Sequence, residues 1–183
     1  MRPPTFETLQ KELQDAKAKG RPYHIVHFDG HGVYADLSED SALKEWLATL
    51  NHLMLGGKST GKHGFLLFES PGSKHGMRPV DGQTLGQLLH DNGVPILVLN
   101  ACQSAMHEAD APAADAETVH EAVRAIGSLA QAVVDQGIPA VLGMRYSVFV
   151  VTAAQYIGEL YRALAKGSGF WRGRQSRAQA PAA

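Results

Sequence analysis

Cys102 and His31 are the two residues whose types and spacing offer the clearest chemistry in this sequence. Cys102 closely follows an apolar run, and His31 stands 71 residues earlier (102 − 31) between Gly30 and Gly32. A cysteine thiol has a pKa of about 8.5 and is mostly protonated at neutral pH, so a nucleophilic cysteine needs an adjacent base. Histidine is such a base. The alternative interpretation is that Cys102 is an inert buried thiol, the commoner role of a lone cysteine.

Several neighbouring residues are candidates to assist this pair. The glycine at 32 lets its backbone N–H approach a developing oxyanion, with the backbone N–H of Cys102 as the second donor. Asp29 has two equally supported interpretations, a group that orients His31 or a turn former beside glycine. The candidates for orienting the pair or contacting substrate are Asp29, Tyr34, Asp36 and Arg145. For Arg145, pairing with acidic surface groups is at least as well supported.

Two further segments carry weaker functional signals. Residues 106–117 hold four acidic side chains among alanines, which is typical of a solvated surface loop. The sharper hypothesis is that this loop favours a basic residue before a scissile bond. Residues 56–63 imitate a phosphate-binding loop, but they end in histidine where a magnesium-ligating hydroxyl is needed, so a polar loop is favoured.

The hydrophobic pattern predicts alternating strands and helices that would bring His31 and Cys102 together. Strands are expected at 23–28, 65–68, 95–100 and 139–143, and helices at 6–16, 38–55, 81–92, 128–136 and 147–166. His31 then lies on a loop after the first strand, and Cys102 lies two residues beyond a buried strand that is expected to be central. This order predicts an α/β fold of three α/β/α layers around a mainly parallel sheet, with the site at the carboxyl ends of the strands.

Composition excludes several other classes of protein. The chain has 183 residues, a formal net charge of −1 and a single cysteine. This charge gives no reason to expect direct nucleic-acid binding, and no apolar run is long enough to cross a bilayer. One cysteine excludes an internal disulfide. We therefore expect one cytoplasmic domain with no membrane partner.

Two sequence motifs resemble those of a known family. Arg21-Pro22-Tyr23-His24-Ile25-Val26-His27-Phe28-Asp29-Gly30-His31-Gly32 resembles the histidine motif of CHAT domains, which are related to caspases, separases and gingipains. Leu97-Val98-Leu99-Asn100-Ala101-Cys102-Gln103-Ser104-Ala105 is similar to the cysteine motif of the same family. Residues 128–144 and 161–164 also match, so the resemblance extends from about residue 5 to residue 169.

The resemblance implies a caspase-like fold and a cysteine endopeptidase that uses no metal and no cofactor. In it, His31 is the general base and Cys102 the nucleophile that cleaves protein or peptide substrates through a thioester. The family also implies regulatory domains or partner proteins, so residues 1–183 would be one CHAT domain from a longer multidomain protein. Residues 170–183 depart from the family pattern as an atypical tail. The alternatives are an inactive CHAT scaffold and a small-molecule-binding α/β domain.

Overall fold

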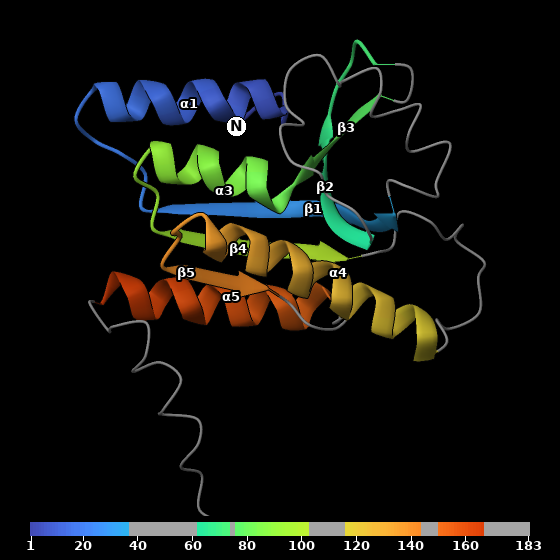
Figure 1. The fold of residues 1–183 in the computed structure, drawn as a ribbon. Helices are drawn as coiled ribbons and strands as arrows, with labels where there is room; N and C mark the ends of the chain where they lie inside the picture. The colour runs from blue at the N-terminus through green and yellow to red at the C-terminus, as the bar shows by residue number, and fades with distance from the viewer. Residues whose placement is uncertain (37–61, 74–75, 103–115, 144–149, 167–183) are drawn as a thin grey trace, which may run out of the picture. The chain divides into compact units, whose positions relative to one another are not determined.

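A computed structural model describes residues 1–36, 62–73, 76–102, 116–143 and 150–166 of the chain. The chain forms two compact units, Met1–Ser147 and Val148–Ala183. The first contains, in order, α1 (Phe6–Ala18), β1 (Ile25–Asp36), β2 (Lys62–Glu69), β3 (Met77–Asp81), α3 (Gly82–Asp91), β4 (Ile96–Cys102), α4 (Ala116–Asp135) and β5 (Ala140–Gly143). Figure 1 shows these elements coloured along the chain.

The second unit contains α5 (Val150–Ala165), which confirms most of the helix predicted at 147–166. Within this helix, burial raises the pKa of the Tyr161 hydroxyl above its ordinary value of 10.0, because a low-dielectric environment disfavours the charged phenolate. None of the described helices is long and apolar enough to cross a membrane.

In the described part of the first unit, the sheet has five strands in the order β3-β2-β1-β4-β5. β1 pairs parallel with β4, and β4 pairs parallel with β5. β2, however, pairs antiparallel with both β1 and β3. The sheet is therefore mixed, and the prediction of a mainly parallel sheet is wrong. The prediction missed β3, whose short connection from β2 permits a hairpin but not the long crossover that a parallel pair requires.

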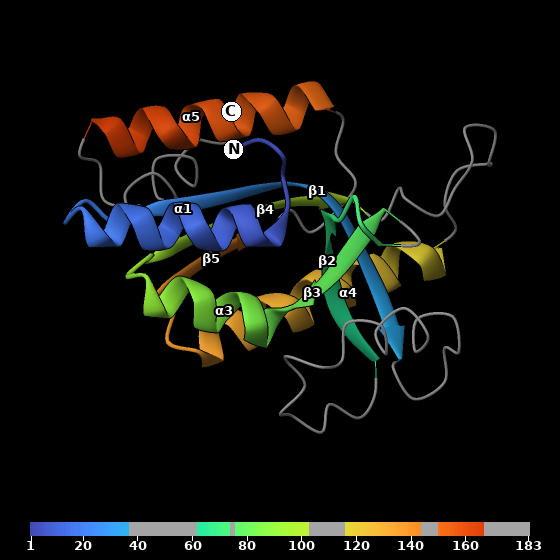
Figure 2. The same cartoon turned by 90° about the horizontal axis from the view of Figure 1, so that it is seen from above.

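The hydrophobic core lies between one face of the sheet and the helices α1, α3 and α4 (Figures 1 and 2). Leu97 and Leu99 of β4 face this core and are almost completely buried. The helices contribute Phe6, Leu9, Leu13, Leu85, Leu89, Leu129 and Val133. Val98 points to the other face and is also buried, so β4 is buried on both faces as predicted. It is an interior strand, while β1 occupies the middle of the sheet.

The chemistry of their ends explains where α1 and α3 begin. Thr5 caps α1 by accepting a hydrogen bond from the N–H of Thr8, and Gly20, after the helix, has a positive φ of 67°. α3 begins at its predicted cap, Asp81. α4 begins at Ala116, earlier than the predicted start at Ser128. Ser128 does not cap this helix, because it lies in the helix interior, and its hydroxyl accepts the N–H of Gly64 in β2 at 3.1 Å.

Asp81 offers a direct test of one helix boundary. Its carboxylate accepts the N–H of Thr84 at 2.6 Å, which satisfies a donor that the first turn of a helix leaves unpaired. We expect Asp81→Ala to lower the free energy of unfolding by about 1 kcal/mol, measured by urea denaturation. Asp91→Ala is the control, because a carboxylate at the carboxyl end of the same helix opposes the helix dipole. Equal losses in the two variants would contradict the assignment of Asp81 as the cap.

β1 continues through the segment that was predicted to be a turn. Asp29, Gly30, His31 and Gly32 all lie within the strand, and neither glycine is among the described residues with positive φ. A Cβ atom at position 30 would lie 3.0 Å from the ring of Phe28. Gly30 therefore allows the close approach of a core aromatic ring, and the prediction that His31 sits on a loop is wrong.

Candidate active site

His31 and Cys102 lie at the same register position of two adjacent parallel strands. The pairing of β1 with β4 matches His31 with Cys102, and Cys102 is the last residue of β4. Adjacent strands are about 4.8 Å apart, and paired positions of parallel strands share one face of the sheet. Cys102 is therefore not beyond its strand as predicted, but the register brings the two backbone positions together.

β1 changes its neighbour at His31. Residues 25–31 of β1 pair with β4, whereas residues 31–36 pair with β2. In Figure 2, β1 bends along its length, and in Figure 1 the β2 and β3 hairpin rises steeply from the direction of β4 and β5. Among the described strands, none pairs with the β4-facing edge of β1 beyond His31. The pairing of β1 with β4 thus ends at His31 and Cys102, the two candidate residues.

The order of the strands makes this position a topological switch point. From β1 the chain moves outward to β2 and β3, and it then returns to the other side of β1 to form β4 and β5. In open α/β sheets, ligands bind outside the carboxyl ends of strands where the winding reverses. Cys102 ends β4 at such a point. His31 and Cys102 therefore lie at a switch point, as predicted for the carboxyl ends of the strands, although the sheet is mixed rather than mainly parallel.

Asp29 and Asn100 form a second cross-strand pair one step from His31 and Cys102. Their register positions match, and the Asn100 side-chain amide donates a hydrogen bond of 2.9 Å to Oδ1 of Asp29. Because alternate residues of a strand share a face, this pair lies on the same face as His31 and Cys102. Asp29 is inside a strand, so its interpretation as a turn former is wrong. Its carboxylate contacts Asn100.

Asn100 is the residue near the site that the sequence interpretation did not select. Its separation from Asp29, 71 residues, equals that between Cys102 and His31. In a parallel pair of strands, all matched residues are separated by the same number of positions in the sequence, as these two polar pairs are. This repeated spacing is a signal in the sequence that would have identified the Asp29 and Asn100 contact.

Among the described residues, the structure does not bring the other predicted site residues together with His31 and Cys102 in the same way. Gly32 pairs with Leu66, Tyr34 with Gly64 and Asp36 with Lys62 along the β1 and β2 ladder. Tyr34 and Asp36 occupy positions that alternate with that of His31, on the opposite face of the sheet. Other predicted features lie outside the described residues. They are Arg145, the predicted helix and most of the phosphate-loop imitation within residues 37–61, and most of the acidic segment within residues 103–115.

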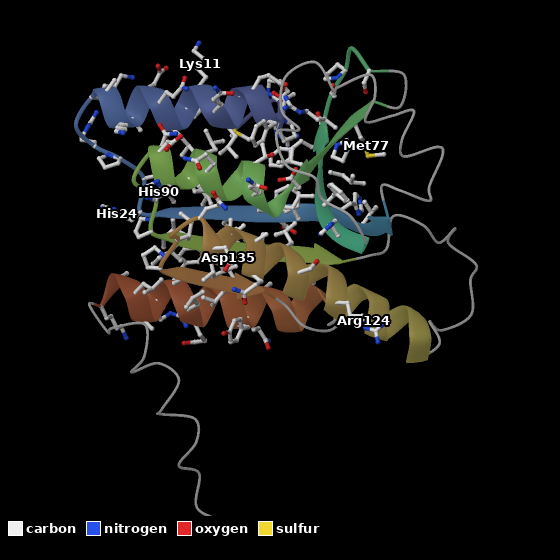
Figure 3. The ribbon with its side chains drawn as sticks, in the orientation of Figure 1. Lys11, His24, Met77, His90, Arg124 and Asp135 are labelled. Atoms are coloured by element: carbon white, nitrogen blue, oxygen red, sulfur yellow. The ribbon has the colours of Figure 1, made fainter. Side chains whose placement is uncertain are left out.

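The face that carries the two pairs is polar and accessible on β1. His27, Asp29 and His31 are exposed, while residues 26, 28 and 30, on the core side, are half-buried. Figure 3 shows His24 at the other, amino-terminal end of β1, where the strand begins. On this face, exposed polar side chains of β1 therefore extend up to His31, which is matched with the last residue of β4.

Fold and site define an α/β domain with a histidine and a cysteine in register at a topological switch point. Comparison with known families identifies residues 3–180 as a CHAT domain. The chain therefore belongs to the CHAT domain family, a family associated with caspase-like peptidases. Searches of curated proteins and of solved structures returned no match.

Proposed function

We propose that this chain is a cysteine endopeptidase domain with a caspase-like three-layer fold, in which His31 and Cys102 hydrolyse peptide bonds. The observation that carries the proposal is the register of β1 and β4, which matches His31 with Cys102 at the switch point. A histidine beside a thiol supplies the base that the thiol needs at neutral pH. The membership of the CHAT family supports the same chemistry.

The proposed reaction proceeds in two stages at Cys102. His31 takes the thiol proton while the thiolate attacks the carbonyl carbon of the scissile bond. The oxyanion that forms is stabilised by the backbone N–H groups of Gly32 and Cys102. His31 then gives the proton to the departing amine as the carbon–nitrogen bond breaks, leaving a thioester. A water molecule, deprotonated by His31, hydrolyses the thioester, and the thiol is restored.

The substrates and regulation follow from the same proposal. The substrates are proteins or peptides in the cytoplasm, and neither nucleic acid nor a membrane takes part directly. Residues 1–183 act as one CHAT domain of a longer protein, controlled by partner or sensor modules, with residues 170–183 as an atypical tail. Arg145 is proposed to contact substrate beside the catalytic pair, whereas Tyr34 and Asp36 occupy positions on the opposite face of the sheet from His31 and are not proposed to do so.

Covalent labelling of Cys102 tests the proposal. We expect an acyloxymethyl-ketone peptide probe to modify Cys102 in the folded parent protein, with the adduct located by mass spectrometry. His31→Ala should slow labelling by about 10²-fold or more, because general-base assistance contributes at least that much. Labelling that is absent in the parent, with candidate partner proteins added, would indicate a catalytically inactive scaffold instead.

A further inference from the structure

We propose that Asp29, held by Asn100, is a specificity residue that selects a basic side chain immediately before the scissile bond. The inference rests on the proposed function, because it assigns a substrate class to the same site. It starts from the cross-strand hydrogen bond of 2.9 Å between the Asn100 amide and Oδ1 of Asp29. This pair lies one step along the ladder from His31 and Cys102, on the same face.

The spacing is suited to a substrate side chain next to the reacting carbonyl. Positions two residues apart on a strand are about 6.7 Å apart, so Asp29 lies about that far from His31 along β1. Measured diagonally to β4, its position is about 8 Å from that of Cys102. An arginine or lysine side chain of a residue bound at Cys102 spans such a distance. The carboxylate would then meet its cationic end.

Among the residues that the structure describes, the Asp29 carboxylate contacts a neutral amide and no cation. Its partner is a neutral amide that occupies one of its two oxygens. Within the described part of the chain, no cation forms an ion pair with Asp29. The residue is also exposed. Asn100 therefore fixes the direction of the carboxylate without cancelling its charge, and a guanidinium can bind it with charge-assisted hydrogen bonds.

The charge of Asp29 has little net effect on the catalytic pair itself. At these similar separations, the interaction of one negative charge with a cationic imidazole and its interaction with an anionic thiolate are opposite in sign and comparable in size. Transferring the proton from cysteine to histidine is therefore almost unaffected. The cationic side chain of a substrate, by contrast, interacts with Asp29 without a second, opposite effect that cancels the attraction. Removing the charge of Asp29 should thus change the choice of substrate rather than the reactivity of the thiol.

Two probes that differ only in charge test this inference. Acyloxymethyl-ketone peptides with arginine or its neutral isostere citrulline before the reactive ketone would be compared by their rates of labelling Cys102. We expect the parent to react about ten- to a hundredfold faster with the arginine probe, as charged hydrogen bonds of this kind contribute. Asp29→Asn keeps an oxygen that accepts from Asn100 and should bring the two rates together.

Asp135→Asn is the matched control. Asp135 is an exposed aspartate that accepts a hydrogen bond of 2.8 Å from the Gln131 amide, but it ends α4, away from the carboxyl end of β4 (Figure 3). Its variant should keep the preference for arginine. Equal rates in a parent whose labelling depends on His31 would overturn this inference and leave the proposed function intact. An equal slowing of both probes by Asp29→Asn would also overturn it, and a parent that reacts with neither probe would overturn both proposals.

Discussion

Replacing His31 with alanine should reduce kcat/KM for peptide cleavage by about 10²- to 10⁴-fold at pH 7, the contribution typical of a positioned general base. Without this histidine, only a few per cent of an ordinary thiol is ionised at neutral pH, and no group protonates the leaving amine. Cys102→Ala removes the nucleophile itself and should leave no thioester pathway. Rates with a fluorogenic peptide, measured under conditions in which the parent labels at Cys102, would quantify both losses.

His27 provides the control for this experiment. It is an exposed histidine on the same face of β1, but it pairs with Val98 rather than with Cys102. It lies four residue steps along the strand from His31, a distance of about 13 Å. His27→Ala should therefore retain activity close to that of the parent. Similar losses in His27→Ala and His31→Ala would refute the role of the register, because both would then reflect damage to the strand.

Gly82→Val should lower the free energy of unfolding by about 3 kcal/mol, because there is no room for a side chain at this position. A Cβ atom there would lie 2.5 Å from the backbone oxygen of Leu129 and 2.8 Å from the Cβ of Ala132. Both obstacles belong to α4, and the first is main chain. α3 and α4 would have to separate, exposing core residues such as Leu85. Urea denaturation followed by circular dichroism would measure the loss.

Gly127 is the control for packing, because it is a helical glycine with open space around it. Apart from its chain neighbours and the nearby backbone of its own helix, an added Cβ atom there would have no described heavy atom within 4 Å. Gly127→Ala should stabilise the protein by about 0.5 to 1 kcal/mol, since alanine restricts the unfolded chain and favours helix. The two glycine substitutions are therefore expected to have opposite signs. A destabilisation shared by both would show that α4 tolerates no change, and not that Gly82 is a close contact.

Local patterns determined most of the helices and strands near the site. Helical spacing and capping residues predicted α1 and α3, and the apolar run before Asn100 predicted a strand buried on both faces. The choice of His31 and Cys102 also came from the sequence, through the chemistry of thiols and the family motifs. These features depend on neighbouring residues along the chain, which is why the pattern of residue types was sufficient to predict them.

The direction of strands and the extent of β1 required the tertiary structure. Two glycines beside His31 predict a turn if only the local chain is considered, yet pairing with β2 and β4 keeps the segment extended. The hairpin of β2 and β3 made the sheet mixed. Hydrogen bonds between strands distant in sequence outweigh weak local preferences. The sequence by itself therefore determined which residues are candidates for the chemistry, while long-range strand pairing alone decided that His31 is matched with Cys102 and Asp29 with Asn100.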